Sequence, residues 1–129
     1  MIMFFVVGVV IIGVWFLTQR FMPTTSGQLL NGSKFTSALA VHPEAVVIDV
    51  RTPGEYASGH MKGAINIDVQ SAIFGGEIAK LDTSGTYFVY CHSGRRSAVA
   101  TTMMRQKGFA DIYELAGGAS AAPLLMTER

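Results

Sequence analysis

Short runs of consecutive apolar residues restrict the fold of this chain more than any other feature of its sequence. Residues 45–50 (AVVIDV) form a nearly continuous branched run, which is typical of a parallel strand covered on both faces. Similar runs occur at residues 64–67, 87–90 and 112–115. Because helix-like patterns separate these runs, the sequence predicts an α/β domain with a mainly parallel central sheet flanked by helices.

The segments between the runs carry helical signals of different strength. One helix is expected between Ser33 and Pro43, and a weaker one over residues 73–81. Another is expected over residues 97–107, with Gly108 as its C-cap. The apolar residues expected to share a face in the first and last of these helices are Phe35, Ala38, Leu39, Val99, Ala100, Met103 and Met104.

A further helix start is specific in its chemistry. Thr52 is an N-cap residue, Pro53 suits the first helical position, and Glu55 lies where it can complete a capping box. This pattern predicts that a helix begins directly after the strand at residues 45–50.

The N-terminus is apolar without interruption over residues 1–17. At about 1.5 Å per helical residue, this run falls a little short of a bilayer core of about 30 Å, and a few more residues can extend it. We therefore predict that residues 1–22 form an apolar transmembrane helix, a single-pass anchor, with a cleaved signal peptide as the alternative. A short polar linker over residues 23–27 and a domain over residues 28–129 follow.

The charges of the chain say little about partners. The 10 basic and 9 acidic residues are well mixed and give a net charge of +1, so nothing marks a nucleic-acid-binding surface. Arg20 and Lys34 are the first charged side chains after the apolar run. By the positive-inside rule they favour a cytoplasmic domain, and a periplasmic or other extracytoplasmic domain stays open.

Cys91 is the only cysteine, and it stands between a strand-like run and a helix in the stretch YCHSGRRS. A single thiol forms no intramolecular disulfide, and the chain has no C-x-x-C pair for a structural zinc ion. The N–H groups of residues 91–96 can curl around the sulfur, and the next helix directs its positive end to the same place. With Arg95 and Arg96 nearby, we expect a lowered thiol pKa and a reactive nucleophile.

The residues of this loop allow other interpretations. Cys91 could be an inert core residue, as free cysteines often are, but its polar neighbours favour reactivity. Gly94 suits a tight loop that needs a positive φ or close backbone approach. The side chain of His92 is expected to point outward, and not to act as a base or a metal ligand.

Three motifs in order resemble those of the single-domain rhodaneses, sulfurtransferases that carry sulfur as a cysteine persulfide. They are DVRTPGEY at residues 49–56, GHMKGAINI at residues 59–67 and CHSGRRSA at residues 91–98, with Gly-Phe at 108–109 and Gly-Gly at 117–118 after them. The resemblance covers residues 28–120. One departure is that no aromatic residue follows Gly118, so the last helix is expected to be short or loosely packed.

The resemblance implies roles for individual residues. Cys91 would be the nucleophile, and the amides of the loop would hold the substrate or the persulfide. The loop residues are His92, Ser93, Gly94, Arg95 and Arg96. The positions expected to be scaffold are Asp49, Arg51, Glu55 and His60. Arg51 and Glu55 are spaced to pair with each other, and Asp49 can brace the loop from beneath.

The resemblance also implies a reaction. A small sulfur-containing anion such as thiosulfate would load Cys91, and a thiol or cyanide would take the sulfur away, with no metal or organic cofactor. One alternative is a membrane-tethered relay or binding module that passes the persulfide to a dedicated protein partner. Another is a rhodanese-fold cysteine phosphatase, but its C-x5-R loop would need an arginine where this chain has Ser97.

Overall fold

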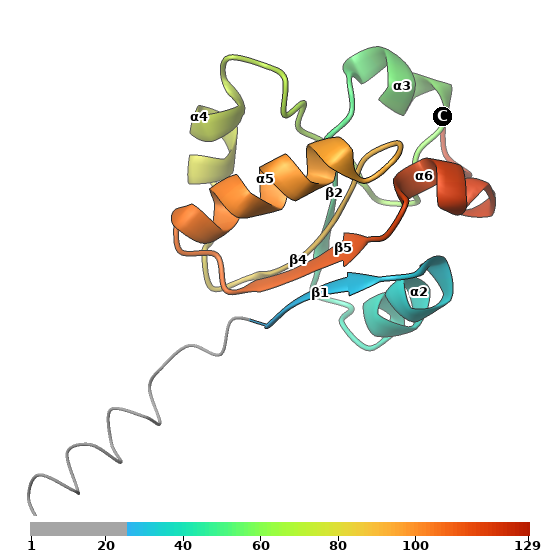
Figure 1. The fold of residues 1–129 in the computed structure, drawn as a ribbon, viewed down its shortest axis with the longest axis horizontal. Coiled ribbons are helices and arrows are strands. Elements are labelled where there is room, and N and C mark those ends of the chain that lie inside the picture. Colours follow the sequence, from blue (N-terminus) through green and yellow to red (C-terminus); the bar gives the residue numbers. More distant parts are fainter. Residues whose placement is uncertain (1–25) are drawn as a thin grey trace, which may run out of the picture.

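The computed structural model describes residues 26–129, which form a five-stranded sheet flanked by helices (Figure 1). The strands lie in the order β1-β5-β4-β2-β3, and all neighbouring strands are parallel. Their bounds are β1 Ser26–Leu30, β2 Val46–Asp49, β3 Ile65–Asn66, β4 Thr86–Tyr90 and β5 Asp111–Leu115. The parallel sheet predicted from the apolar runs is confirmed.

Helices occupy most of the connections between the strands. Their bounds are α2 Gly32–Ala40, α3 Pro53–Ser58, α4 Phe74–Ala79, α5 Arg95–Gln106 and α6 Gly118–Ala121, with a 3-10 helix η1 at Pro123–Leu125. Each expected helix is present, and α6 is short as predicted.

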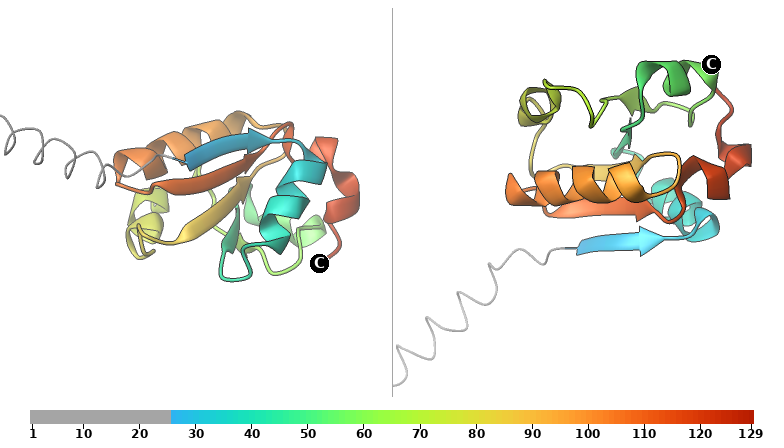
Figure 2. Two further views of the ribbon diagram at one scale, coloured as in Figure 1. Left: turned by 90° about the horizontal axis from the view of Figure 1, so that it is seen from below. Right: turned by 45° about the horizontal axis from the view of Figure 1, so that its top comes forward.

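Two hydrophobic cores lie on opposite faces of the sheet, because alternate residues of a strand point to opposite sides. In β4, Tyr87 and Val89 join the core beneath α4 and α5, whereas Phe88 and Tyr90 join the core beneath α2 and α6. Figure 2 shows α5 and α2 on opposite sides of the sheet. Cys91 continues the alternation and joins the α5 side, which places its sulfur under the start of that helix.

Of the N-terminal predictions, only the end of the linker expected over residues 23–27 lies within the described residues. The anchor predicted over residues 1–22 lies outside the described residues. Within residues 26–129, no helix is both long enough and apolar enough to cross a membrane. Strand β1 begins at Ser26 and pairs with β5, so the sheet starts inside the linker expected over residues 23–27.

Helix α5 differs from its prediction in its start and in its buried face. It begins at Arg95 and not near Ser97, and Val99 of the predicted apolar stripe is 55% exposed. The buried face consists of Ser97, Ala100, Thr101 and Met104. The two hydroxyl residues face the core because each finds a polar partner there: Ser97 bonds with Cys91 and Thr101 with Glu114.

The start of α3 follows the prediction closely. The Thr52 hydroxyl accepts a hydrogen bond from the Glu55 amide at 3.3 Å, and the Glu55 carboxylate accepts one from the Thr52 amide at 3.5 Å. This is the capping box expected from the sequence. It fixes the direction in which the chain leaves β2, and so it places Glu55 at the carboxyl edge of the sheet.

Candidate functional site

Cys91 lies at the carboxyl edge of the sheet, directly after β4 and before α5. Ligand sites of parallel α/β sheets lie at this edge. The connection is tighter than expected, because α5 begins at Arg95 and the loop is confined to residues 91–94. Gly94 is the N-cap of α5 with φ +98°, a left-handed conformation that favours glycine.

The sulfur of Cys91 lies in a small polar cradle. The Gly94 N–H donates to Sγ at 3.0 Å, and the thiol donates to Oγ of Ser97 at 3.5 Å. Burial alone would raise the pKa of the Cys91 thiol, but hydrogen bonds from the Ser97 hydroxyl and amide and from the amides of Gly94 and Ser93 outweigh it, so the pKa is lowered. Among the loop amides singled out from the sequence, those of Gly94 and Ser93 therefore act on the sulfur.

Ser97 is the site residue that sequence reasoning missed. Its hydroxyl donates to the Gly94 carbonyl at 3.2 Å while it accepts from the thiol. If Cys91 ionises, the same hydroxyl can turn and donate to the sulfur. The available signal was the position of Ser97, six residues after the cysteine and among the buried residues of α5.

Ser97→Ala should raise the pKa of Cys91, because it removes a hydroxyl that stabilises the thiolate. We expect persulfide loading at neutral pH to fall about tenfold, the scale of one hydrogen bond to a charged group. The ultraviolet absorbance of the thiolate, followed against pH, measures the pKa directly. Thr102→Ala is the matched control, because it removes a hydroxyl from the exposed side of the same helix.

Cys91 is also fully buried, with 0% of its surface exposed, and it belongs to the core beneath α5. The interpretation of Cys91 as a core residue and its interpretation as a reactive thiol are therefore compatible. The residue packs in the core while its sulfur is held by a polar loop. A donor can meet this sulfur only when the loop or the side chains over it move. His92 is exposed, as expected, and Ser93 is exposed beside it.

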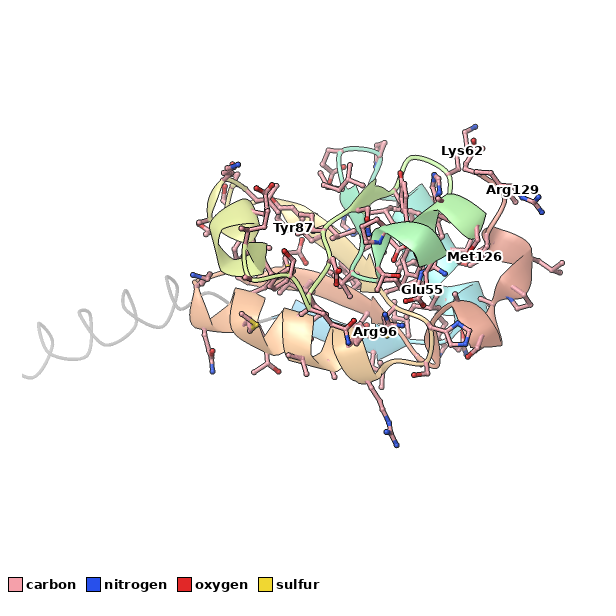
Figure 3. The ribbon with its side chains drawn as sticks, turned by 90° about the horizontal axis from the view of Figure 1, so that it is seen from above. Glu55, Lys62, Tyr87, Arg96, Met126 and Arg129 are labelled. Carbon is pink, nitrogen blue, oxygen red and sulfur yellow. The ribbon has the colours of Figure 1, made fainter. Side chains whose placement is uncertain are left out.

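The two arginines of the loop have different environments. Arg95 is exposed, whereas Arg96 donates two hydrogen bonds to the Glu55 carboxylate, at 2.6 and 2.9 Å. Figure 3 shows Glu55 and Arg96 pointing toward each other from α3 and α5. The prediction that Arg51 pairs with Glu55 is wrong, since the Glu55 carboxylate forms its ion pair with Arg96. Much of the Arg96 charge near the sulfur is thus compensated.

The Arg96 guanidinium is also the main cause of the low pKa of Glu55, which falls to about 2. A carboxyl whose pKa is lower in the folded state stabilises the fold above its ordinary pKa of 4.5, and this stabilisation is lost as pH falls toward 2. Because the Glu55 side chain is 35% exposed, solvent screening limits the contribution to about 1 kcal/mol.

Glu55→Gln should therefore lower the free energy of unfolding by about 1 kcal/mol at neutral pH. Below the native pKa of Glu55 the difference from the unmodified chain should vanish, because both side chains are then uncharged. Urea unfolding at a series of pH values tests this. A difference that stays constant down to the lowest pH would show that the ion pair does not cause it.

Arg51 pairs instead with Asp49, beneath the loop. Arg51 donates to both carboxylate oxygens of Asp49, the closest contact being 2.7 Å, and both residues are buried. Arg51 also donates to the Gly59 carbonyl at 2.6 Å and lies over the ring of Tyr90 at 5.6 Å. Since Tyr90 precedes Cys91, the Asp49–Arg51 pair lies next to the strand end that carries the loop.

His60 has a structural role. Its Nδ1 lies 2.8 Å from the Tyr56 carbonyl, and its ring stacks on Tyr56 with 3.7 Å between ring centres. Its backbone forms an antiparallel bridge with Glu128 near the C-terminus. His60 thus contacts α3 through its ring and the C-terminal segment through its backbone.

Helix α6 packs directly on the back of the loop, a contact that the sequence did not predict. The Ala119 amide donates to the Cys91 carbonyl at 2.8 Å, and the Ser120 amide donates to the His92 carbonyl at 2.9 Å. Gly118 permits this approach, because a Cβ there would overlap the carbonyl oxygen of Cys91. The available signal was the Gly-Gly pair at residues 117–118.

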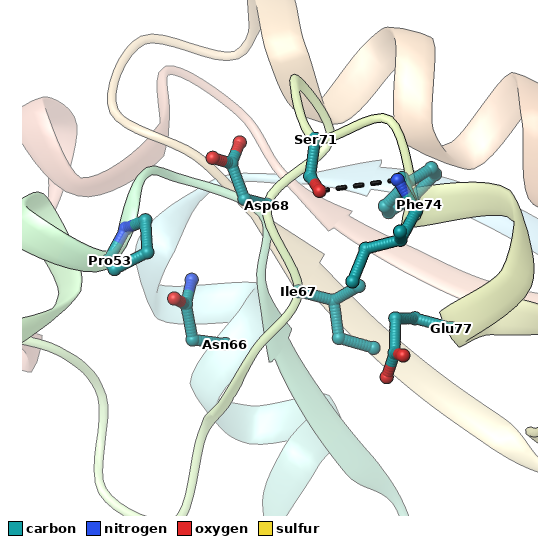
Figure 4. Close-up of a pocket in the computed structure, with 8 residues that line it drawn as sticks. Pro53, Asn66, Ile67, Asp68, Ser71, Phe74 and Glu77 are labelled. Atoms are coloured by element: carbon teal, nitrogen blue, oxygen red, sulfur yellow. Dashed lines mark hydrogen bonds between the residues drawn. The ribbon is translucent and has the colours of Figure 1, made fainter.

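A cavity of about 380 Å³ opens at the same edge of the sheet, beside β3 (Figure 4). Pro53 and Asn66 form one side of it, and Phe74 and Glu77 of α4 form the other. Within residues 26–129, no group of three or more His, Cys, Asp or Glu side chains is placed to hold a metal ion.

Comparison with known proteins agrees with this arrangement. Residues 35–122 match the family described as Rhodanese-like domain. A thiosulfate sulfurtransferase GlpE from Pseudomonas paraeruginosa is 39% identical over 74 residues, which cover 57% of this chain and 66% of that protein. A tRNA uridine(34) hydroxylase from Acaryochloris marina is 35% identical over 98 residues, but these are only 31% of that protein. The match thus spans about two thirds or less of these relatives.

Solved structures show the same fold. A rhodanese-related protein from Thermoplasma volcanium has a TM-score of 0.57 and 27% sequence identity, over 72% of this chain and 87% of that one. The Rhodanese-like domain of an Anabaena protein has a TM-score of 0.66 at 24% identity, over 78% of this chain and 76% of that one. At 24% identity, the match to the Anabaena domain is evidence for the fold alone.

Proposed function

We propose that this chain, which belongs to the rhodanese-like domain family, is a sulfurtransferase that carries a sulfane sulfur as a persulfide on Cys91. The observation that carries the proposal is the polar cradle around Sγ, in which Gly94 N–H and Ser97 lower the thiol pKa. A lowered pKa increases the fraction of Cys91 that is present as thiolate, the nucleophilic form of cysteine.

In the first step, the Cys91 thiolate attacks the outer sulfur of a donor such as thiosulfate. A bond forms between the two sulfurs, the S–S bond of the donor breaks, and its electron pair leaves with sulfite. The Cys91 persulfide anion remains. Its outer sulfur carries negative charge, which the amides of the loop and the positive end of α5 stabilise.

In the second step, cyanide or the thiolate of an acceptor attacks the outer sulfur of the persulfide. The new bond to the acceptor forms as the bond to the Cys91 sulfur breaks, and the electron pair returns to Cys91 as thiolate. Thiocyanate or an acceptor persulfide leaves. Because the covalent intermediate separates the two half-reactions, ping-pong kinetics are expected.

The experiment that tests the proposal is incubation of the protein with thiosulfate, followed by intact mass measurement and by an assay of thiocyanate after cyanide is added. A mass gain of one sulfur together with thiocyanate production is the expected result. No mass gain with thiosulfate or with any small persulfide donor would contradict the proposal.

A sulfur relay with a dedicated protein partner is the second candidate, favoured by one observation. The sulfur has no exposed surface, so a partner that opens the loop could be needed for rapid turnover. In that case the same experiment would give the mass gain with little thiocyanate. A phosphatase would instead hydrolyse aryl phosphates, and the small polar residue Ser97 at the position of its arginine argues against it.

We further propose that residues 1–22 tether the domain to a membrane, with the domain on the cytoplasmic side. The support is the uninterrupted apolar run at residues 1–17. Two experiments on membranes that carry the full chain test these points: salt and alkaline washing tests the tether, and protease treatment of sealed vesicles tests the side. Release of the chain by salt or alkaline washing would contradict the tether, and protection of the domain in right-side-out vesicles is expected.

A further inference from the structure

The cavity beside β3 lies at the same edge of the sheet as the sulfur site, although no residue of the loop at 91–94 lines it. The Asn66 side chain, in its wall, donates to the carbonyl oxygens of Asp49 and Arg51 at 3.0 and 2.9 Å. Asp49 lies opposite Tyr90 in the sheet, and Tyr90 precedes Cys91. Pro53, another wall residue, begins the helix whose Glu55 holds Arg96.

This cavity has the size and the walls of a small-molecule site. Its volume of about 380 Å³ lies at the lower end of the range of about 300–1,000 Å³ that is usual for such sites. Ile67 and Phe74, both largely buried, provide an apolar wall. Figure 4 shows Asp68 near Ser71, and Glu77 apart from them beyond Ile67. An organic group of a few carbon atoms with one polar end fits these walls.

The charge of the rim is negative. Asp68 and Glu77 are the ionisable residues that line the cavity. Glu77 is paired with Lys80 at 3.0 Å, whereas the Asp68 carboxylate accepts a hydrogen bond from the backbone N–H of Gln70 at 2.9 Å. Arg96 interacts electrostatically with both Cys91 and Asp68, and its guanidinium is held by the Glu55 carboxylate.

We propose that this cavity holds the acceptor of the persulfide sulfur, and that the acceptor is a small thiol with a cationic amino group that pairs with Asp68. The carbon atoms of such an aminothiol would lie on Ile67 and Phe74, with its sulfur directed past the Glu55–Arg96 pair to Cys91. The inference rests on the proposed function. The thiolate of the acceptor attacks the outer sulfur of the persulfide, the bond to Cys91 breaks, and the acceptor leaves as a persulfide.

Three small thiols of different charge test this: cysteamine, which is cationic, 2-mercaptoethanol, which is neutral, and 3-mercaptopropionate, which is anionic. The full chain is loaded with thiosulfate, the donor is removed, and each thiol is added in a single turnover. Intact mass reports the loss of the extra sulfur. Cyanide, which has no organic part to fill the cavity, is the reference acceptor.

The matched variants are Asp68→Asn and Glu44→Gln. Each removes one carboxylate, but Glu44 lies before β2, at the opposite edge of the sheet from Cys91. Because intrinsic thiol reactivity is the same for every variant, the effect of Asp68 is read from ratios between thiols. We expect Asp68→Asn to lower the cysteamine to 2-mercaptoethanol rate ratio about fivefold and to raise the rate with 3-mercaptopropionate, with Glu44→Gln unchanged.

Added salt should reduce the preference for cysteamine in the unmodified chain and not in Asp68→Asn. Equal ratios in the unmodified chain and in Asp68→Asn, or an equal fall in Glu44→Gln, would overturn the inference. Transfer to cyanide would still proceed in that case, so the proposed function would stand. Failure to load sulfur from any donor would instead contradict the proposed function itself.

Discussion

Cys91→Ser is expected to lose persulfide formation completely while the domain stays folded. A serine hydroxyl at this position could still accept the Gly94 N–H and bond with Ser97, so the cradle keeps its polar contacts. Its pKa lies far above that of a thiol, however, and it supplies no nucleophile for a sulfane sulfur. Intact mass after thiosulfate treatment should show no added sulfur, and thiocyanate production should fall to background.

The control for this prediction is the stability of the variant. Because Cys91 is fully buried, the more polar serine should cost about 1 kcal/mol in the free energy of unfolding, which urea unfolding measures. Gln106→Ala, a change on the exposed end of α5, should retain both loading and transfer. Retained sulfur transfer by a folded Cys91→Ser chain would remove Cys91 from the mechanism.

Features that depend on neighbours in the sequence could be predicted. The strand at residues 45–50 was evident because a buried parallel strand is apolar on both faces. The helix start at Thr52 was evident because its capping bonds join residues three positions apart. The place of Cys91 at the edge of the sheet followed from the apolar run at residues 87–90, since the cysteine directly follows that strand.

The partners of the charged residues could not be predicted from spacing. Arg51 and Glu55 are four positions apart, yet Arg51 pairs with Asp49 because Asp49 is fully buried and its carboxylate would be costly without a cation. Glu55 is then available to Arg96, which α5 brings from a distant part of the chain. Burial decides between these pairs, and burial follows from the packed fold.

The positions of elements held by distant parts of the chain also could not be predicted from the sequence. Strand β1 is at the edge of the sheet and pairs with β5, far along the chain, and its polar residues gave no apolar run. The buried face of α5 was displaced toward Ser97 and Thr101 because their hydroxyls are satisfied within the core. Helix α6 carries no periodic pattern, and its position depends on its amides meeting the loop.

Gly118→Ala is expected to have the second-largest effect, because it separates α6 from the loop. Gly118 has φ +60°, and an added Cβ would overlap the carbonyl oxygen of Cys91 and approach the His92 carbonyl carbon at 2.6 Å. These are backbone atoms that cannot turn away, so α6 must move and its two hydrogen bonds to the loop must lengthen or break. We expect a loss of about 3 kcal/mol in the free energy of unfolding.

Gly63→Ala separates the cost of left-handed backbone strain from the cost of the overlap between the new Cβ and the loop. Gly63 also has a positive φ, +74°, but a Cβ there would meet no atom within 4 Å, so it should cost only the left-handed backbone strain of about 1 kcal/mol. Urea unfolding compares the variants, and the rate of persulfide loading should fall at least tenfold in Gly118→Ala alone. Since α6 bonds the carbonyl groups on the back of the loop, its displacement lets the peptide units of Cys91 and His92 rotate, and the amides that hold the sulfur lose their alignment. Equal stability and equal loading in the two variants would mean that the loop keeps its shape without α6.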